Sequence, residues 1–327
     1  MTLPSYALRS RLAALLLASA TGGLAAAQTA PACDTIRLIE PYPPGGSTGV
    51  VARIVAQKLS ADLGQTVIVE NRPGASGNIG SAYVAKAKPD GCTLLIGTDA
   101  THAGNFYLFK DFPYHPIDDF TPITMAARNV LVLVAHPSFP AGSIPELIAH
   151  AKAKPGALFY GSSGIGSPHH LSGALFDHLA GTQMTHVPYA GNAPSIADLV
   201  GGQIGLVYSS LTSAEPHIKA GKIKPLGVTQ RERYAGLPDT PAIHESLPDF
   251  EMTSWLGFFA PAGLPPPLLD TISQSMRTAL QEPKTVAQLA ELGLVVEASD
   301  PQTFAAQQKE TFTSRGELIQ ANDIRAD

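Results

Sequence analysis

The sequence predicts an α/β protein built from two modules of parallel strands. Short apolar or β-branched runs alternate with amphipathic helical runs, the pattern of parallel strands joined by crossover helices. Loops rich in Pro, Gly and Ser follow several strands, for example residues 41–49 after the run Ile36–Glu40. Two apolar runs, near Asn129 and near Met252, mark where the chain crosses from one module to the other.

The first residues have the composition of a secretory leader. Arg9 and Arg11 precede the apolar run Leu12–Ala20, which is too short to span a bilayer. Ala25–Ala27 fits the small-residue rule for cleavage. We therefore expect residues 1–27 to be a signal peptide, cleaved near Ala27 during export. No later apolar run approaches the roughly 20 residues that a membrane span needs.

The charge of the chain indicates neither a nucleic-acid nor a membrane partner. Lys and Arg number 22 against 27 Asp and Glu, a formal net charge of −5, and loss of Arg9 and Arg11 with the leader makes it −7. No basic patch suggests binding to nucleic acid or to an anionic membrane. The 300 residues from 28 to 327 are enough for two domains with full cores.

In the first module, each element has a local sequence reason. Apolar residues from Val50 to Leu63 recur at helical spacing, and Ser47 or Thr48 is placed to cap that helix. The run TVIVE is β-branched, as buried parallel strands are. We expect strands at 36–40, 66–70 and 93–97 and helices at 50–63 and 79–87. The less regular residues 105–124 carry Phe and Tyr side chains that we assign to the core.

The second module begins with a long apolar strand at 129–135. Ser143 and Glu146 have the spacing of a capping box and predict a helix through Lys152. Further strands are expected at 158–161, 204–209 and 223–229, and helices at 168–179, 194–200 and 215–220. A crossing strand at 254–260 then returns to the first module, with helices at 264–281, 285–292 and 301–321 around a strand at 294–298. Residues 28–128 and 252–327 thus form a discontinuous first lobe, and residues 129–251 a second.

The two cysteines, Cys33 and Cys92, each stand just before a predicted strand. If those strands are parallel neighbours, both sulfurs lie at the same end of the sheet. An even cysteine count in an exported chain favours a disulfide over two free buried thiols. We predict a Cys33–Cys92 disulfide.

The Gly/Ser loops predict an anion site. Gly45, Gly46 and Gly49 let backbone N–H groups approach a ligand, and the start of a helix favours negative charge. The same pattern recurs at 67–80 and 158–172. One such loop is an ordinary α/β connection, but three favour a shared site. Since ligands bind at the carboxyl ends of parallel strands, we expect a cleft between the two modules.

Enzyme, nucleotide and metal functions fit the sequence less well. The G-x-S-x-G motif of serine hydrolases would need Gly where Ile165 stands, so an exported serine hydrolase acting on small esters remains only the alternative. Gly74, Gly77 and Gly80 lack the spacing of a dinucleotide loop. Adjacent residues on a helix, such as His169 and His170, diverge by about 100° and do not face one ion.

Seven segments occur in the order of one known family. They are PYPPGGST, ENRPGASGNIG, KPDGCTLLIG, DDFTPI, GSSGIGSPHHL, VPYAG and WLGFFAPAGLP. Over essentially the whole mature chain, the sequence resembles the Bug family of periplasmic solute-binding proteins, the receptors of tripartite tricarboxylate transporters. The resemblance implies the type II periplasmic-binding-protein fold, in which two α/β lobes joined by two crossover strands close on a ligand cleft. It also implies a monomer without cofactor that delivers a carboxylate to membrane permease subunits.

Carried over residue by residue, the resemblance implies a site of backbone N–H groups, hydroxyls and bridging waters rather than an Arg clamp. The first lobe should supply Gly45, Gly46, Ser47, Thr48, Ala75, Ser76, Gly77, Asn78 and Thr98. The second should supply Ser162, Ser163, Gly166, Ser167, His170, Tyr189, Ala190, Gly191 and Ser209. Many members have Asp after the PGGST-like loop, where this chain has Gly49. A ligand amine would lose that partner, so we expect a carboxylic acid without an amino group.

Overall fold

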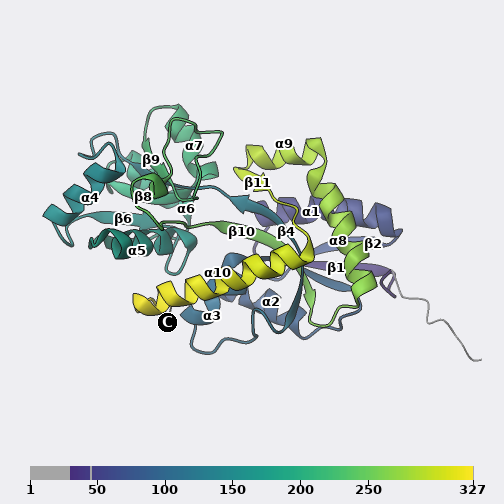
Figure 1. The fold of residues 1–327 in the computed structure, drawn as a ribbon. Coiled ribbons are helices and arrows are strands. Elements are labelled where there is room, and N and C mark those ends of the chain that lie inside the picture. The colour runs from purple at the N-terminus through teal and green to yellow at the C-terminus, as the bar shows by residue number, and fades with distance from the viewer. Residues whose placement is uncertain (1–29, 45, 327) are drawn as a thin grey trace, which may run out of the picture.

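The computed structural model describes residues 30–44 and 46–326, and the expected leader and its cleavage site lie outside them. Two sheets form the centres of two lobes (Figure 1). The six-stranded sheet of the first lobe has the order β11-β4-β10-β3-β1-β2, and the five-stranded sheet of the second lobe has the order β7-β6-β8-β5-β9. Within the described ranges, no helix is long and apolar enough to cross a membrane.

The elements follow the predicted alternation of strands and helices closely. The first lobe contains β1 (Thr35–Glu40), α1 (Ser47–Leu63), β2 (Thr66–Asn71), η1 (Ala75–Gly77), α2 (Asn78–Ala85), β3 (Thr93–Thr98), η2 (Ala100–Gly104), α3 (Asn105–Leu108), β4 (Phe120–Asn129), β10 (Ser254–Pro261), α8 (Pro266–Gln281), α9 (Pro283–Glu291), β11 (Leu294–Val296) and α10 (Pro301–Ala321). The second contains β5 (Leu131–Ala135), α4 (Ile144–Ala153), β6 (Phe159–Ser162), α5 (Pro168–Ala180), β7 (Thr185–Pro188), α6 (Asn192–Val200), β8 (Leu206–Ser210), α7 (Leu211–Lys219), β9 (Lys224–Val228) and η3 (Ile243–Glu245).

Each sheet buries both of its faces, because successive side chains of a strand point to opposite sides. In the first lobe, Leu38 packs in a cluster with α1 and α8, whereas its neighbour Ile39 packs in another with Phe304 of α10. In the second lobe, Leu133 lies in a cluster with α4 and α5, and Val132 in one with α6 and α7. The apolar runs of the strands reflect this two-sided burial.

Two strand segments that cross between the lobes make the sheets mixed rather than wholly parallel. β10 runs antiparallel to β3 and β4, and β5 runs antiparallel to β8 and β9. A strand that enters from the other lobe arrives from the opposite direction, so it cannot continue the parallel order. The expected single strand at 129–135 is wrong in detail: Asn129 ends β4, and β5 begins at Leu131.

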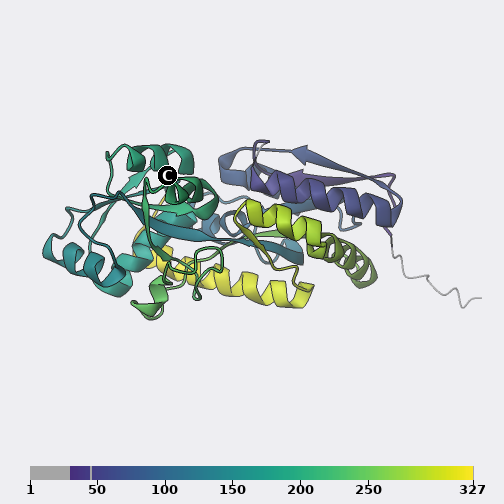
Figure 2. The same ribbon diagram turned by 90° about the horizontal axis from the view of Figure 1, so that it is seen from above.

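The last helix, α10, extends from one lobe to the other (Figures 1 and 2). Near its start, Phe304 belongs to the core of the first lobe. Near its end, Leu318 and Ile319 belong to the core of the second, together with Ile324. The amide of Ala326 donates to the carbonyl of Leu108 at 3.2 Å, so the chain end returns to α3.

The Cys33–Cys92 disulfide is confirmed. β1 and β3 are parallel neighbours, with Arg37 opposite Thr93, which places the two sulfurs at the amino ends of these strands as the sequence argument required. The disulfide closes a segment with a sequence separation of 59 residues across the first lobe.

Candidate functional site

The first-lobe candidates gather at the carboxyl ends of β1, β2 and β3, which are parallel neighbours. The hydroxyl of Tyr42 is 2.8 Å from Oγ1 of Thr98, and a Cβ added to Gly77 would lie 3.2 Å from that same Tyr42 hydroxyl. The side-chain amide of Asn105 donates to the carbonyl of Ser76 at 3.1 Å and to Oδ1 of Asn78 at 2.7 Å. The structure thus brings the loops after all three strands together. Gly45 lies outside the described residues.

The expected cap of α1 is wrong. The helix begins at Ser47, and Gly46 stands at the N-cap position without a side-chain hydrogen bond. Thr48 is buried, and its hydroxyl donates to Oε1 of Glu40 at 2.9 Å instead of to the helix start. The first amides of α1 are therefore not covered by a serine or threonine side chain from this loop.

The second loop holds an unusual backbone conformation. Gly74, Ala75, Ser76 and Gly77 all have positive φ, with values of 130°, 46°, 54° and 93°. Such a conformation costs a non-glycine residue about 1–3 kcal/mol, and it persists where surrounding contacts hold it. The bond from Asn105 to the carbonyl of Ser76 is one such contact. A run of strained residues in a Gly/Ser loop is typical of a ligand site.

The second-lobe candidates lie at the carboxyl ends of β6, β7 and β8, which are also parallel. The backbone amide of Tyr189 donates to the carbonyl of Ser162 at 3.1 Å, which joins the two loops. Ser167 caps α5 by accepting from the amide of His170 at 3.2 Å. Tyr189 turns its hydroxyl to Asp198 at 3.0 Å, Gly191 stands at the N-cap of α6, and Ala190 between them is exposed.

Histidine side chains hold the Gly161–Ser167 loop in place. The ring of His170 stacks on that of His186 at 3.7 Å, and its Nδ1 accepts from the amide of Gly166 at 3.0 Å. His186 in turn lies 2.6 Å from Oγ of Ser162. Burial lowers the pKa of His170 to about 4 and, together with the adjacent His170, that of His186 to about 3. Both rings are therefore neutral at neutral pH, and they add no cation to the loop.

Ser210 joins the two lobes. Its Oγ accepts from the side-chain amides of Asn129 at 3.0 Å and Asn192 at 3.1 Å, and lies 3.3 Å from Nε2 of His169. The amide oxygens of Asn129 and Asn192 are buried, and neither has a hydrogen-bond partner in the described part of the chain. The hydroxyl of Ser209, the expected floor residue, donates to the neighbouring carbonyl of Ser210 at 3.2 Å.

Two serine–histidine contacts of the Gly161–Ser167 loop lack the geometry of a catalytic triad. Ser163 lies 2.7 Å from Nδ1 of His169, whose other nitrogen faces Ser210. Ser162 lies 2.6 Å from His186 and is fully buried. A triad needs an acidic or amide group that orients the histidine. Among the hydrogen bonds and ion pairs found for residues 30–44 and 46–326, no carboxylate contacts either ring.

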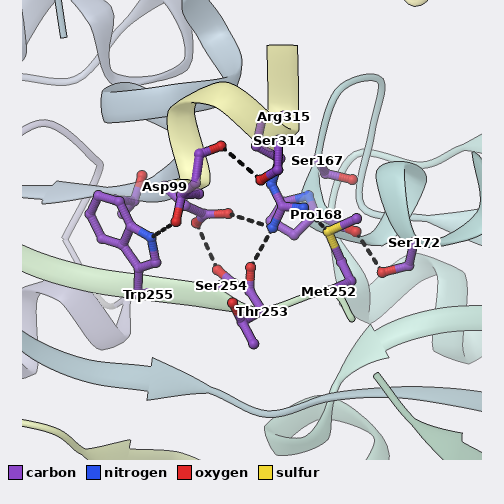
Figure 3. Close-up of polar contacts among 12 residues, drawn as sticks. Asp99, Ser167, Pro168, Ser172, Met252, Thr253, Ser254, Trp255, Ser314 and Arg315 are labelled. Carbon is purple, nitrogen blue, oxygen red and sulfur yellow. Dashed lines mark hydrogen bonds and ion pairs between the residues drawn. The ribbon is translucent and has the colours of Figure 1, made fainter. Parts of the chain in front are cut away.

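Loops of the two lobes meet across the molecule. A Cβ added to Gly166 of the second lobe would lie 2.2 Å from Cδ1 of Leu108, so this glycine rests directly on α3 of the first lobe. Figure 3 shows the polar contacts beside the second crossover, where α10 approaches the start of α5.

A buried ion pair lies at this junction. Asp99, which follows Thr98, accepts from the hydroxyl of Ser254 at 2.8 Å and lies 3.8 Å from the Arg315 guanidinium. Arg315 also donates to the carbonyl of Thr253 and contacts the sulfur of Met252 (Figure 3). Burial raises the pKa of Asp99, an effect that Arg315 opposes. The end of β3 is thus tied to the crossover strand.

Several residues of this site have no short-range sequence signal. They act through partners between 6 and 81 positions away: Tyr42, Asn105, Asn129, His169, His186, Asn192 and Ser210. Of these residues, Tyr42 and His169 stand inside the segments that carry the family resemblance, and His169 is next to the predicted His170. Their placement follows from sheet order, which a single sequence does not reveal.

Comparison with known proteins points to one family. The sequence model described as tripartite tricarboxylate transporter family receptor, TctC, matches residues 51–324. BugT of Bordetella pertussis is 36% identical over 279 residues, which cover 84% of this chain and 85% of BugT.

Solved structures agree. A protein of R. palustris solved with adipate is 34% identical with a TM-score of 0.76, and the match covers 89% of this chain and 98% of that one. MatC from Rhodopseudomonas palustris, solved with bound malate, is 30% identical with a TM-score of 0.73, and the match covers 87% and 98%.

Proposed function

Because the chain belongs to the TctC family of tripartite tricarboxylate transporter receptors, we propose that it binds a small carboxylic acid in the periplasm. It then presents this acid, as a monomer, to the membrane permease subunits of such a transporter. The observation that carries the proposal is the pair of Gly/Ser loop sets at the carboxyl ends of two parallel strand groups, one in each lobe. We also infer that the chain is a receptor rather than an enzyme.

The proposed ligand is an anion held by neutral donors. The candidate residues comprise Gly, Ala, Ser, Thr, Asn, Tyr and one His whose pKa is lowered to about 4, and they include neither Lys nor Arg. Backbone N–H groups and hydroxyls bind a carboxylate without the cost of burying a fixed cation. The relatives solved with adipate and malate support a dicarboxylate or hydroxy acid as the class to test first.

Bridging waters fit this site as well. The unpaired amide oxygens of Asn129 and Asn192 accept hydrogen bonds and cannot bind a carboxylate directly. A ligand hydroxyl or a water that donates to them would satisfy both the buried oxygens and the ligand. Such waters adapt one site to acids of different length.

Closure of the two lobes would couple binding to transport. A ligand that draws donors from both lobes binds the closed form more tightly than the open one, so binding shifts the population toward closure. The contact of Gly166 with Leu108 and the bond between Asn129 and Ser210 are places where the lobes already meet.

A thermal-shift panel tests the proposal. Mono-, di- and tricarboxylates, hydroxy acids, aromatic acids and amino acids are added to the protein, and at least one non-amino acid should raise Tm. If no acid raises Tm, the proposal fails. If aspartate or glutamate binds more tightly in calorimetry than any non-amino dicarboxylate, the expectation of a ligand without an amino group fails. High turnover of generic esters would instead favour the serine hydrolase.

A matched pair of substitutions on α1 locates the site. Ser47→Phe fills the loop and should abolish the ligand-induced shift while far-UV circular dichroism stays native. Ala61→Phe adds the same ring at an exposed position of the same helix and should leave the shift intact. Equal affinity of Ser47→Phe and the wild type would place the site elsewhere.

A further inference from the structure

A buried carboxylate lies directly beneath the loop that begins α1. Glu40 is the last residue of β1, and its side chain is fully buried. The hydroxyl of Thr48 donates to Oε1 at 2.9 Å, and the side-chain amide of Asn71 donates to Oε2 at 2.7 Å. Both oxygens of Glu40 therefore accept a hydrogen bond from a side chain. Among the described residues, no ion pair within 4.0 Å involves Glu40.

Glu40 fills the space that a side chain at position 49 would need. A Cβ added to Gly49 would lie 2.7 Å from each of the two Glu40 oxygens and 2.9 Å from an amino group of Arg53. A Cβ and a carboxylate oxygen do not approach that closely, so a side chain at 49 would have to displace the Glu40 carboxylate from its bonds to Thr48 and Asn71. The carboxylate beside the start of α1 therefore comes from Glu40 of β1 and not from a residue at position 49 of the helix. Although position 49 is Gly, this part of the first lobe still contains a carboxylate.

The position of this charge bears on what can bind above it. The first turn of α1 is the positive end of the helix dipole, which would otherwise favour an anion. A carboxylate that accepts from the Thr48 hydroxyl of that turn lies in this field, and it repels a second negative charge several ångströms away. Arg53 is exposed, so solvent screens its opposite charge more strongly than it screens the buried Glu40.

We propose that Glu40 sets the ligand specificity of the cleft, as a positioning residue that holds the Thr48 loop and keeps a second ligand carboxylate away from the α1 end. The inference rests on the proposed function. Of two ligands that differ only at the end nearest α1, the cleft prefers the one without a negative charge at that end, and other donors of the cleft hold the carboxylate at the opposite end.

The test compares ligands that differ only at one end. Adipate, its monomethyl ester and 6-aminohexanoate carry a negative, neutral or positive group at the far end of the same chain, and the succinate, monomethyl succinate and 4-aminobutyrate series repeats this at shorter length. Affinities are measured by calorimetry for the wild type and for Glu40→Gln, which keeps the shape of the side chain and removes its charge.

Glu40→Gln should raise the affinity for the dianion relative to the monoester by about tenfold, because a repulsion is removed and Arg53 is no longer offset. The ratio of the amino compound to the monoester should fall. Glu70→Gln is the matched control: it removes a partly exposed charge from the neighbouring strand β2, where Glu70 pairs with Arg72, and should leave both ratios within about twofold of the wild type.

Two further variants keep the proposal testable if Glu40→Gln folds poorly. Gly49→Asp alone places two carboxylates in one space and should lower Tm and weaken binding by about tenfold or more. Glu40→Val combined with Gly49→Asp moves the carboxylate from the strand to the helix and should restore both Tm and the order of the three ligands.

The outcomes separate the two proposals. If the wild type binds and the ligand ratios of Glu40→Gln stay within about twofold of the wild type, the role of Glu40 is overturned and the receptor function stands. If Gly49→Asp matches the wild type in Tm and affinity, the steric conflict between positions 40 and 49 is overturned. If neither the six compounds nor any acid of the thermal-shift panel binds the wild type, the proposed function fails and this inference falls with it; if a panel acid binds but none of the six does, the role of Glu40 is overturned and the receptor function stands.

Discussion

The fully buried ring of His102 should make the first lobe sensitive to acid. It stacks on Phe259 at 3.8 Å and lies edge-on to Phe120 at 4.5 Å. The hydroxyl of Thr101 donates to the carbonyl of Thr98, so Nδ1 of His102 donates to Thr101 at 2.9 Å, and Nε2 is left without a partner among the described residues. Burial lowers the pKa of His102 to about 3.

The sign and size of the effect follow from this shift. The unfolded ring takes up a proton near its usual pKa of 6.5, whereas the folded ring stays neutral down to about 3. The unfolded state therefore binds more protons in this window, and stability falls as pH falls from 6.5 toward 3. Between pH 7.5 and 5.5, His102 alone should remove about 1.4 kcal/mol from the free energy of unfolding.

His102→Phe keeps an aromatic ring on Phe259 and removes the titration. Urea unfolding at pH 7.5 and 5.5 can be followed by the fluorescence of Trp255, the only tryptophan of the chain, whose ring lies 6.2 Å from that of Phe259. The wild type should lose about 1.4 kcal/mol more than His102→Phe between the two pH values, since the other histidines are common to both. His178→Gln, at an exposed position of α5, is the control and should follow the wild type. Parallel losses in His102→Phe and the wild type, within about 0.4 kcal/mol, would refute the reasoning.

Three further predictions concern the loops, the disulfide and the ion pair. Gly77→Ala places a Cβ at a φ of 93° and should cost about 1–3 kcal/mol and abolish the ligand-induced Tm shift; an unchanged shift would exclude this loop from the site. Loss of the Cys33–Cys92 disulfide by double replacement with Ser should cost about 4 kcal/mol in urea unfolding, given its separation of 59 residues. Arg315→Met leaves the buried Asp99 without its cation and should cost about 3 kcal/mol or more, and adding Asp99→Asn should recover part of it; no recovery in the double variant would contradict the coupling.

The sequence was sufficient for the fold class and for most elements. The α/β assignment and the type II periplasmic-binding-protein fold are confirmed by the two sheets and by the similarity to a solved periplasmic binding protein, BugD. Apolar runs such as that of β5 are visible in the sequence because both faces of each sheet are buried. The disulfide could also be predicted from the sequence, because two cysteines that precede neighbouring parallel strands lie at the same end of the sheet.

The missed elements depend on tertiary context. β4 alternates apolar residues with Thr, Pro and Arg, so its strand pattern is weak, and its pairing with β10 stabilises it from more than 100 positions away. The cap of α1 was misassigned because Thr48 has a nearer acceptor in Glu40, which the sequence places eight residues earlier on a different element. The lobe boundaries at 128/129 and 251/252, like the full set of ligand contacts, stay predictions.

Relations between loops were also beyond the sequence. The stacking of His170 on His186, and the three contacts that meet at Ser210, join residues that lie on different elements. A single sequence shows that such residues exist but not which strand ends are neighbours. The strand order of the sheet supplies that information, and it shows that histidines far apart in the sequence contact the same Gly161–Ser167 loop.

The path of α10 has a mechanical consequence. If the two crossover strand segments were the only connections, the lobes would be free both to bend and to twist relative to each other. Helix α10 packs into the core of the first lobe at Phe304 and into the core of the second lobe at Ile319. It is therefore a third connection between the lobes, in addition to the two crossover strands. Twisting one lobe against the other about the long axis of the molecule would disrupt the apolar packing around Ile319, whereas a hinge motion that opens the cleft need not. The two lobes should consequently open by a hinge motion in one plane and close again in the same relative position.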